Sequence, residues 1–164
     1  MCAMCHSGAR QTLAPAFDYK PGAKLSDYMY PDTSSPGTRQ IDVHGKQYQL
    51  LMASACFQKS SVLTCGSCHN THVEERNNMK LFSSRCISCH TTVSHDGVNM
   101  PETLRAGLIN NCIDCHMPLL PSKAILLQLA DQSKSTPDFI RTHRIAIYPE
   151  ITEQFNKKAK GKGE

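Results

Sequence analysis

The stretch CGSCHNTH, Cys65–His72, decides how this chain folds. Two cysteines are separated by two residues, a histidine follows the second cysteine directly, and another histidine comes three residues later. The first five residues of this pattern recur as CAMCH (Cys2–His6), CISCH (Cys86–His90) and CIDCH (Cys112–His116). Four copies of C-x-x-C-H in 164 residues indicate a shared chemical role rather than chance.

C-x-x-C-H is the pattern for covalent attachment of c-type haem. The spacing lets both thiols reach one edge of a porphyrin and form thioethers with its vinyl groups, while the adjacent histidine turns under the ring and binds the iron. The sequence therefore predicts four haem c groups. The predicted attachment residues are Cys2, Cys5, Cys65, Cys68, Cys86, Cys89, Cys112 and Cys115, and the predicted proximal iron ligands are His6, His69, His90 and His116.

Two other interpretations of the cysteines are open. Pairs of C-x-x-C can close a tetrahedral zinc site, and cysteines in an oxidising compartment can form a disulfide framework. Both leave the histidine after every pair unexplained. The ninth cysteine, Cys56, lies among small and apolar residues, which favours a buried free thiol over a bridge to another chain.

The remaining histidines match the number of distal positions. The chain has eight histidines, and the four outside the motifs are His44, His72, His95 and His143. We predict that these four are the distal ligands of the four irons. At any one iron the alternatives are a methionine ligand, which raises the reduction potential, or an open coordination position.

The spacing of His72 and His95 restricts which iron each can bind. Each follows a proximal histidine so closely that it cannot reach the opposite face of the same porphyrin. Each is therefore expected to bind a different haem and to hold two haems together. If the first and second haems stack, and the third and fourth likewise, His72 binds the first haem and His95 the fourth. His44 and His143 then serve the second and third haems, in one order or the other.

The apolar content predicts a small protein core. Leu, Ile, Val and Phe make up just under a fifth of the residues, and tryptophan is absent. That composition is near the limit at which a chain can bury enough apolar surface to fold alone. Porphyrin faces supply the missing apolar surface, so the polypeptide is expected to wrap the haems and to be unfolded without them.

Local patterns predict a mainly α fold with extensive loops, short helices around a stack of four haems, and little β structure. The segment 15–37 is rich in Pro, Gly, Ser and Asp and is expected to be loop. Helices are expected at 46–60, 100–116 and 122–133, and 136–150 combines a helix-start signal with an extended second half. One domain, 1–155, and a basic flexible tail, 156–164, complete the expected organisation.

Charge and hydropathy exclude several partners. The formal net charge of +4 falls to about zero once four ferric haems with their propionates are counted, and no basic patch carries interleaved aromatic residues, so nucleic acid is not expected. No apolar stretch is long enough to span a membrane. Because haem c is attached outside the cytoplasmic membrane, the protein is expected to be exported, with Met1 internal to a longer precursor.

The chain resembles multihaem c-type cytochromes. CGSCHNTH has the C-x-x-C-H-x-x-H form common among hydroxylamine-oxidoreductase-like cytochromes, and CIDCHMP (Cys112–Pro118) has their frequent ending. The segments Val43–His72 and Thr142–Pro149 look like the haem region and the distal-histidine segment of exported, tetratricopeptide-associated cytochromes. The haem module alone is also similar to the tetrahaem units of extracellular cytochrome filaments. The resemblance implies electron transfer along stacked haems in the periplasm or outside the cell.

These patterns are compatible with three functions. Ligation of every iron by two histidines favours electron transfer to redox partner proteins or terminal acceptors, without catalysis. One haem without a distal ligand would instead permit an enzyme that acts on a small nitrogen or sulfur species. A zinc-organised binding module is the third. For the electron-transfer protein, a monomeric shuttle and a filament or other homo-oligomer are both open.

Overall fold

A computed structural model describes residues 2, 6, 9–15, 17–31, 41–95 and 107–160. Their contacts fall into two compact units, each built from separate stretches of chain. Unit 1 comprises Met1–Ser61 with Leu119–Ile145, and unit 2 comprises Val62–Pro118 with Ala146–Glu164.

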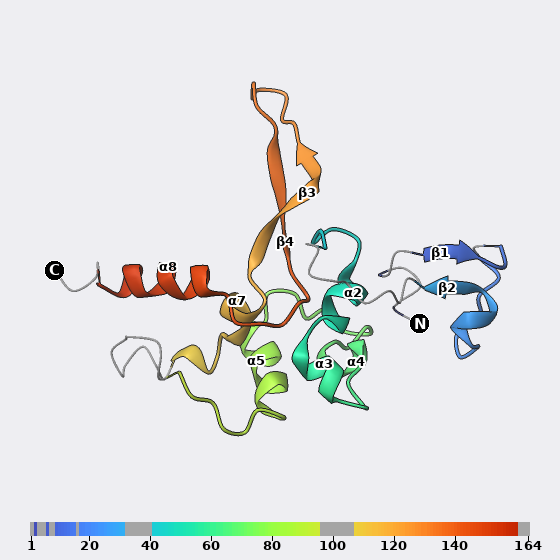
Figure 1. The fold of residues 1–164 in the computed structure, drawn as a ribbon, viewed down its shortest axis with the longest axis horizontal. Coiled ribbons are helices and arrows are strands. Elements are labelled where there is room, and N and C mark those ends of the chain that lie inside the picture. The colour runs from blue at the N-terminus through green and yellow to red at the C-terminus, as the bar shows by residue number, and fades with distance from the viewer. Residues whose placement is uncertain are drawn as a thin grey trace. The chain divides into compact units, whose positions relative to one another are not determined.

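The first part of unit 1 contains a small antiparallel sheet, and its second strand lies in the segment 15–37, which was expected to be loop. Strand β1 (Ala9–Thr12) pairs with β2 (Met29–Pro31), and the 3-10 helix η1 (Leu25–Asp27) lies between them in sequence (Figure 1). In the segment that connects the two strands, the Tyr19 and Tyr28 rings pack edge to face with their centroids 5.2 Å apart. The rest of the predicted loop, 32–37, lies outside the described residues.

The helix expected at 46–60 forms as two shorter helices, α2 (Gln47–Met52) and α3 (Ala55–Lys59). The break falls at Ser54, which is fully buried. Its hydroxyl donates to the carbonyl oxygen of Leu50 and accepts from the backbone N–H of Ile145 at 2.8 Å. The Ser54 side chain thus bonds backbone groups of two segments that are distant in sequence. Such side-chain bonds to the backbone compete with regular helical bonding, and the helix is interrupted here.

The prediction of a helix at 122–133 is wrong. Strand β3 (Leu119–Leu127) pairs antiparallel with β4 (Thr136–Arg141), and together they form a hairpin (Figure 1). The helix start expected at Thr136 is wrong for the same reason. The Ser122 hydroxyl does accept the backbone N–H of Ile125 at 3.0 Å, as a helix N-cap would, but the bond serves a bulge in the strand.

Unit 2 is built from short helices. Helix α4 (Cys65–Cys68) precedes α5 (Met79–Ile87), whose N-cap Asn78 accepts the backbone N–H of Leu81 at 3.0 Å. Helix α7 is Cys112–His116, and α8 (Pro149–Lys160) begins with a proline, a residue suited to the first helical position. Residues 156–160 of the predicted tail lie in α8.

The helix expected at 100–116 does not run unbroken into the fourth cysteine motif. Residues 109–110 form a turn, Asn111 precedes α7 as its N-cap, and the motif then forms a helix of its own. The first part of the expected helix, 100–106, lies outside the described residues.

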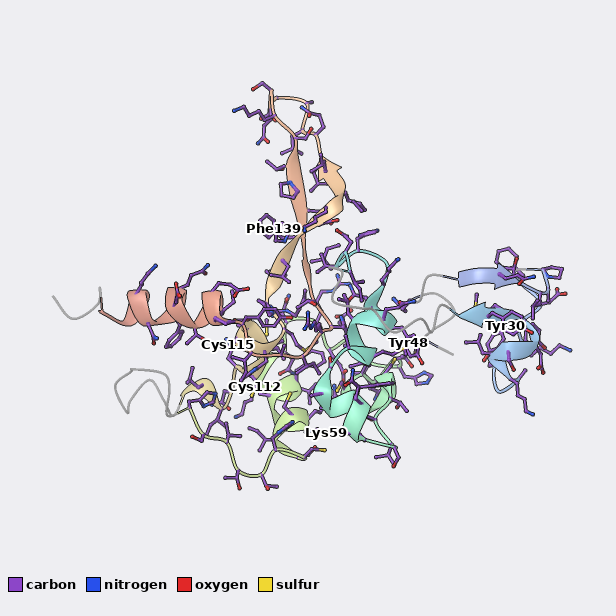
Figure 2. All side chains as sticks on the ribbon, viewed as in Figure 1. Tyr30, Tyr48, Lys59, Cys112, Cys115 and Phe139 are labelled. Atoms are coloured by element: carbon purple, nitrogen blue, oxygen red, sulfur yellow. The ribbon has the colours of Figure 1, made fainter. Side chains whose placement is uncertain are left out.

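The hydrophobic core of the described residues is small. It consists of Met29, Val43, Leu50, Leu51 and Ile113. Several large apolar side chains are exposed instead, among them Phe139 on β4, which Figure 2 labels. No helix among the described residues combines the length and the hydropathy needed to cross a lipid bilayer.

Candidate haem-attachment sites

The described residues of the C-x-x-C-H motifs make helical backbone hydrogen bonds. In the first three motifs the backbone N–H of the histidine donates to the carbonyl oxygen of the first cysteine, four residues earlier. These bonds are His6 to Cys2 at 3.0 Å, His69 to Cys65 at 2.9 Å and His90 to Cys86 at 2.9 Å. The fourth motif is helix α7 itself. Residues three apart on a helical turn lie on the same side of it, so the two cysteines of the second, third and fourth motifs share one side.

No disulfide joins the cysteines of the described residues, and none of these side chains is fully buried. They are Cys2, Cys56, Cys65, Cys68, Cys86, Cys89, Cys112 and Cys115. Cys56 is half-buried, less buried than expected. Cys5 lies outside the described residues. Figure 2 shows Cys112 and Cys115 together on α7, where burial raises the pKa of the Cys115 thiol.

No group of three or more His, Cys, Asp or Glu side chains within the described ranges has the arrangement of a metal-ion site.

The ring of His116 is oriented by the chain segment that follows Arg144. Its Nδ1 lies 2.9 Å from the carbonyl oxygen of Ala146, and the Ala146 N–H donates to the His116 carbonyl oxygen at 3.2 Å. A carbonyl oxygen can only accept, so Nδ1 carries the proton and the lone pair lies on Nε2. This is the tautomer that an iron-binding imidazole needs, with the second nitrogen hydrogen-bonded to fix the ring.

The ring of His143 is held in the same way within unit 1. Its Nδ1 lies 2.8 Å from Oε1 of Gln47. The Nε2 amide of Gln47 donates to the Val43 carbonyl oxygen at 2.7 Å, which sets the orientation of the amide. Gln47 therefore accepts the proton from Nδ1, and the lone pair of His143 lies on Nε2.

The other predicted distal histidines differ in their surroundings. His95 is half-buried, and its ring centroid lies 6.4 Å from that of His116. His44 and His72 are exposed; the backbone N–H of His72 donates to Asn70 at 3.0 Å. The structure therefore brings His95 close to His116, a predicted proximal ligand, whereas His44 and His72 lie at turns in the backbone.

Asp42 fixes the turn that carries His44. Its carboxylate accepts from the His44 N–H at 2.8 Å, from the Ser122 hydroxyl at 2.9 Å and from the Lys123 N–H. Burial opposes the charge, but these hydrogen bonds outweigh it and hold the pKa of Asp42 below its ordinary value. The turn before α2 is thereby joined to the β3–β4 hairpin within unit 1.

Glu75 and Arg85 join the second motif to the third. Arg85 donates to both carboxylate oxygens of Glu75, one of them at 2.8 Å, and to the Cys68 carbonyl oxygen at 2.7 Å. Glu75 also accepts the Asn70 N–H at 3.0 Å. The hydrogen bonds from Arg85, with that from Asn70, lower the pKa of Glu75 to about 2.

Helix α5 also contacts the proximal histidine of the second motif. The Phe82 ring packs edge to face against His69 at 5.3 Å, and the Arg85 guanidinium lies 5.6 Å from the Phe82 ring centre. Sequence reasoning missed Phe82, Arg85, Glu75 and Gln47. The contacts of Phe82 with His69, of Arg85 with Glu75 and of Gln47 with His143 join residues ten or more positions apart, so no local pattern predicts them.

These observations fit covalently attached haem. The described motifs offer thiols at helical spacing, and His116 and His143 carry their lone pairs on Nε2. The small core leaves apolar side chains exposed that a porphyrin face can cover. No protein-family model, curated protein or solved structure matches the chain.

Proposed function

We propose that this protein transfers electrons through four covalently attached haem c groups, each with two histidine ligands. The observation that carries the proposal is the helical turn at the C-x-x-C-H motifs, which sets two thiols on one side and a histidine directly after them. Four motifs and four further histidines in one short chain add to it.

In the proposed protein, the haem and the polypeptide have different roles. Bound haem supplies an iron that cycles between the ferric and ferrous states. The chain attaches the porphyrin through the motif cysteines and fills both axial positions with imidazoles, which closes the iron to substrates. Hydrogen bonds at Nδ1 of His116 and His143 fix the imidazole rings and make them stronger donors, which favours the ferric state.

Intact mass and spectra test the proposal directly. The purified protein is expected to exceed the polypeptide mass by four haems, to keep its colour after acid–acetone extraction, and to show a low-spin ferric spectrum. Fewer than four haems would contradict the stoichiometry. A high-spin ferric signal from the native protein would instead favour the enzyme, with one open iron that acts on a small nitrogen or sulfur species.

The proposed setting is the periplasm or the cell exterior, where haem c is attached and where redox proteins or terminal acceptors exchange electrons with exposed haem edges. A chain with this little polypeptide per haem is suited to a longer conduit as well as to a shuttle. Size-exclusion chromatography and negative-stain microscopy of the native protein separate the two. Monodisperse monomers with fully six-coordinate haems would exclude the filament.

A further inference from the structure

His95 and His116 lie at the separation that two axial ligands of one iron require. Their ring centroids are 6.4 Å apart and their planes are tilted by 39°. Imidazole nitrogens bind first-row metal ions at about 2 Å, so two such bonds plus the radius of each ring separate facing ring centres by about 6 Å.

The orientation of His116 supports the same arrangement. Its Nδ1 is engaged by the Ala146 carbonyl oxygen, so Nε2 is the nitrogen available for a metal. Both rings are half-buried, and both belong to unit 2. Cys112 and Cys115 lie on the same short helix as His116, so a haem attached there has its iron at this ring (Figure 2).

A second, independent contact joins the third and fourth motifs. The backbone N–H of Cys112 donates to the Ser83 hydroxyl at 3.0 Å, and Ser83 is 1% exposed on helix α5, which also carries Cys86. This bond holds the start of α7 beside α5 (Figure 1). The two attachment sites are therefore neighbours for a reason that does not involve His95.

We infer that His95 and His116 are the two axial ligands of the haem attached at Cys112 and Cys115, and that this haem and the one attached at Cys86 and Cys89 form a directly linked pair. The inference rests on the proposed function. A chain spans at most about 3.6 Å per residue, so the five steps from His90 to His95 keep their Cα atoms within about 18 Å. The segment 90–95 then binds one iron at each end.

Removal of His95 in two backgrounds tests the pairing. In the four-haem protein, His95→Ala is expected to convert about a quarter of the ferric haem to the high-spin form, and added imidazole should restore the low-spin form. In a Cys112→Ala/Cys115→Ala background, which lacks the fourth haem, His95→Ala should add no high-spin haem. His72→Ala is the matched control and should add high-spin haem in both backgrounds.

The outcomes separate the pairing from the proposed function. High-spin haem after His95→Ala in both backgrounds, or in neither, overturns the pairing while a pyridine haemochrome assay still counts four haems in the parent protein. A parent without covalent haem overturns the proposed function and the pairing with it. If the three-haem background does not fold, NMR of the native protein decides: imidazole protons of His95 and His116 should both cross-relax with protons of one haem, and contacts to different haems refute the inference.

Discussion

At the residue scale, hydrogen bonds at the imidazole Nδ1 atoms distinguish the proposed ligands. His116 is held by a backbone carbonyl oxygen, which no substitution of a side chain removes, whereas His143 is held by the side chain of Gln47. The Nδ1 hydrogen bond of His143 can therefore be removed by a substitution at Gln47, whereas that of His116 cannot be removed in this way. Glu75 has Arg85 as its main partner, and the backbone N–H of Asn70 is the second.

Gln47→Leu should weaken the binding of iron by His143. The leucine leaves Nδ1 without its acceptor, and loss of such a partner lowers metal affinity by about 10- to 100-fold. We expect a fraction of high-spin ferric haem that increases with temperature, measured by absorption and EPR. Gln58→Leu is the matched control, because Gln58 is exposed and donates to the Met52 carbonyl oxygen instead. Equal spectra of the two variants would contradict the role of Gln47.

Glu75→Gln should destabilise the protein at neutral pH but not in strong acid. The pKa of Glu75 is lowered from 4.5 to about 2, so its charge contributes stability above pH 4.5 that is lost as the pH falls toward 2. The difference in unfolding free energy between wild type and variant should therefore shrink over that range, as measured by urea denaturation. Glu74→Gln is the control, because Glu74 accepts from the Arg76 N–H at the surface. A pH-independent difference would refute this account.

At the scale of elements, helix α5 is the part of unit 2 that contacts each of its three cysteine motifs. It carries Cys86, packs Phe82 against His69, and accepts the Cys112 N–H on Ser83. Its nine residues are too few for a stable isolated helix, so its N-cap and these contacts must hold it. Substitutions that disrupt α5 should therefore affect several of the proposed haem sites together.

Ser83→Ala should cost about 1 kcal/mol of unfolding free energy, because it removes the hydrogen bond between the part-buried Cys112 N–H and the buried Ser83 hydroxyl. Ser84→Ala is the matched control, since Ser84 is exposed and its hydroxyl bonds within its own helix to the Leu81 carbonyl oxygen. Urea denaturation of the haem-loaded variants gives both values. If the two alanine variants unfold at the same urea concentration, the bond does not hold α7 to α5.

At the scale of the whole molecule, the described residues bury few apolar side chains for the length of the chain. The conformational entropy lost on folding is of the order of 1–2 kcal/mol per residue and must be offset mainly by apolar burial. Porphyrin faces supply that burial in the proposed protein, and the thioethers tie distant segments to rigid groups. Folding and haem attachment should therefore be one process.

The haem-free chain should be largely unfolded. A variant with all eight motif cysteines changed to alanine cannot attach haem, and we expect it to show no cooperative thermal transition by circular dichroism, while the four-haem protein melts cooperatively. Cys56→Ala, which removes the one cysteine outside the motifs, should keep the transition. A cooperative melt of the haem-free chain would show that the polypeptide core suffices.

Local patterns were reliable for some elements and unreliable for others. The helix near Lys46–Ser60 was predicted, although Ser54 divides it into two. The run SKAILLQLADQS (Ser122–Ser133) was predicted as helix and lies mostly in β3 and the turn after it, because its apolar residues suit a helix face and a strand equally well. Pairing with β4 makes this segment a strand rather than a helix. A pattern within one segment cannot predict such pairing, because it depends on a second segment.

The sequence by itself determined the spacing of the cysteine motifs, and the proposed attachment chemistry depends on that spacing. Two thiols and a histidine within five residues act through the geometry of one helical turn, so their spacing is sufficient to predict a haem site. The tertiary structure alone decided which groups surround those sites: His95 beside His116, Gln47 on His143, and the ion pair of Glu75 with Arg85. Such contacts join residues 10 to 96 positions apart, and the path of the intervening chain brings them together.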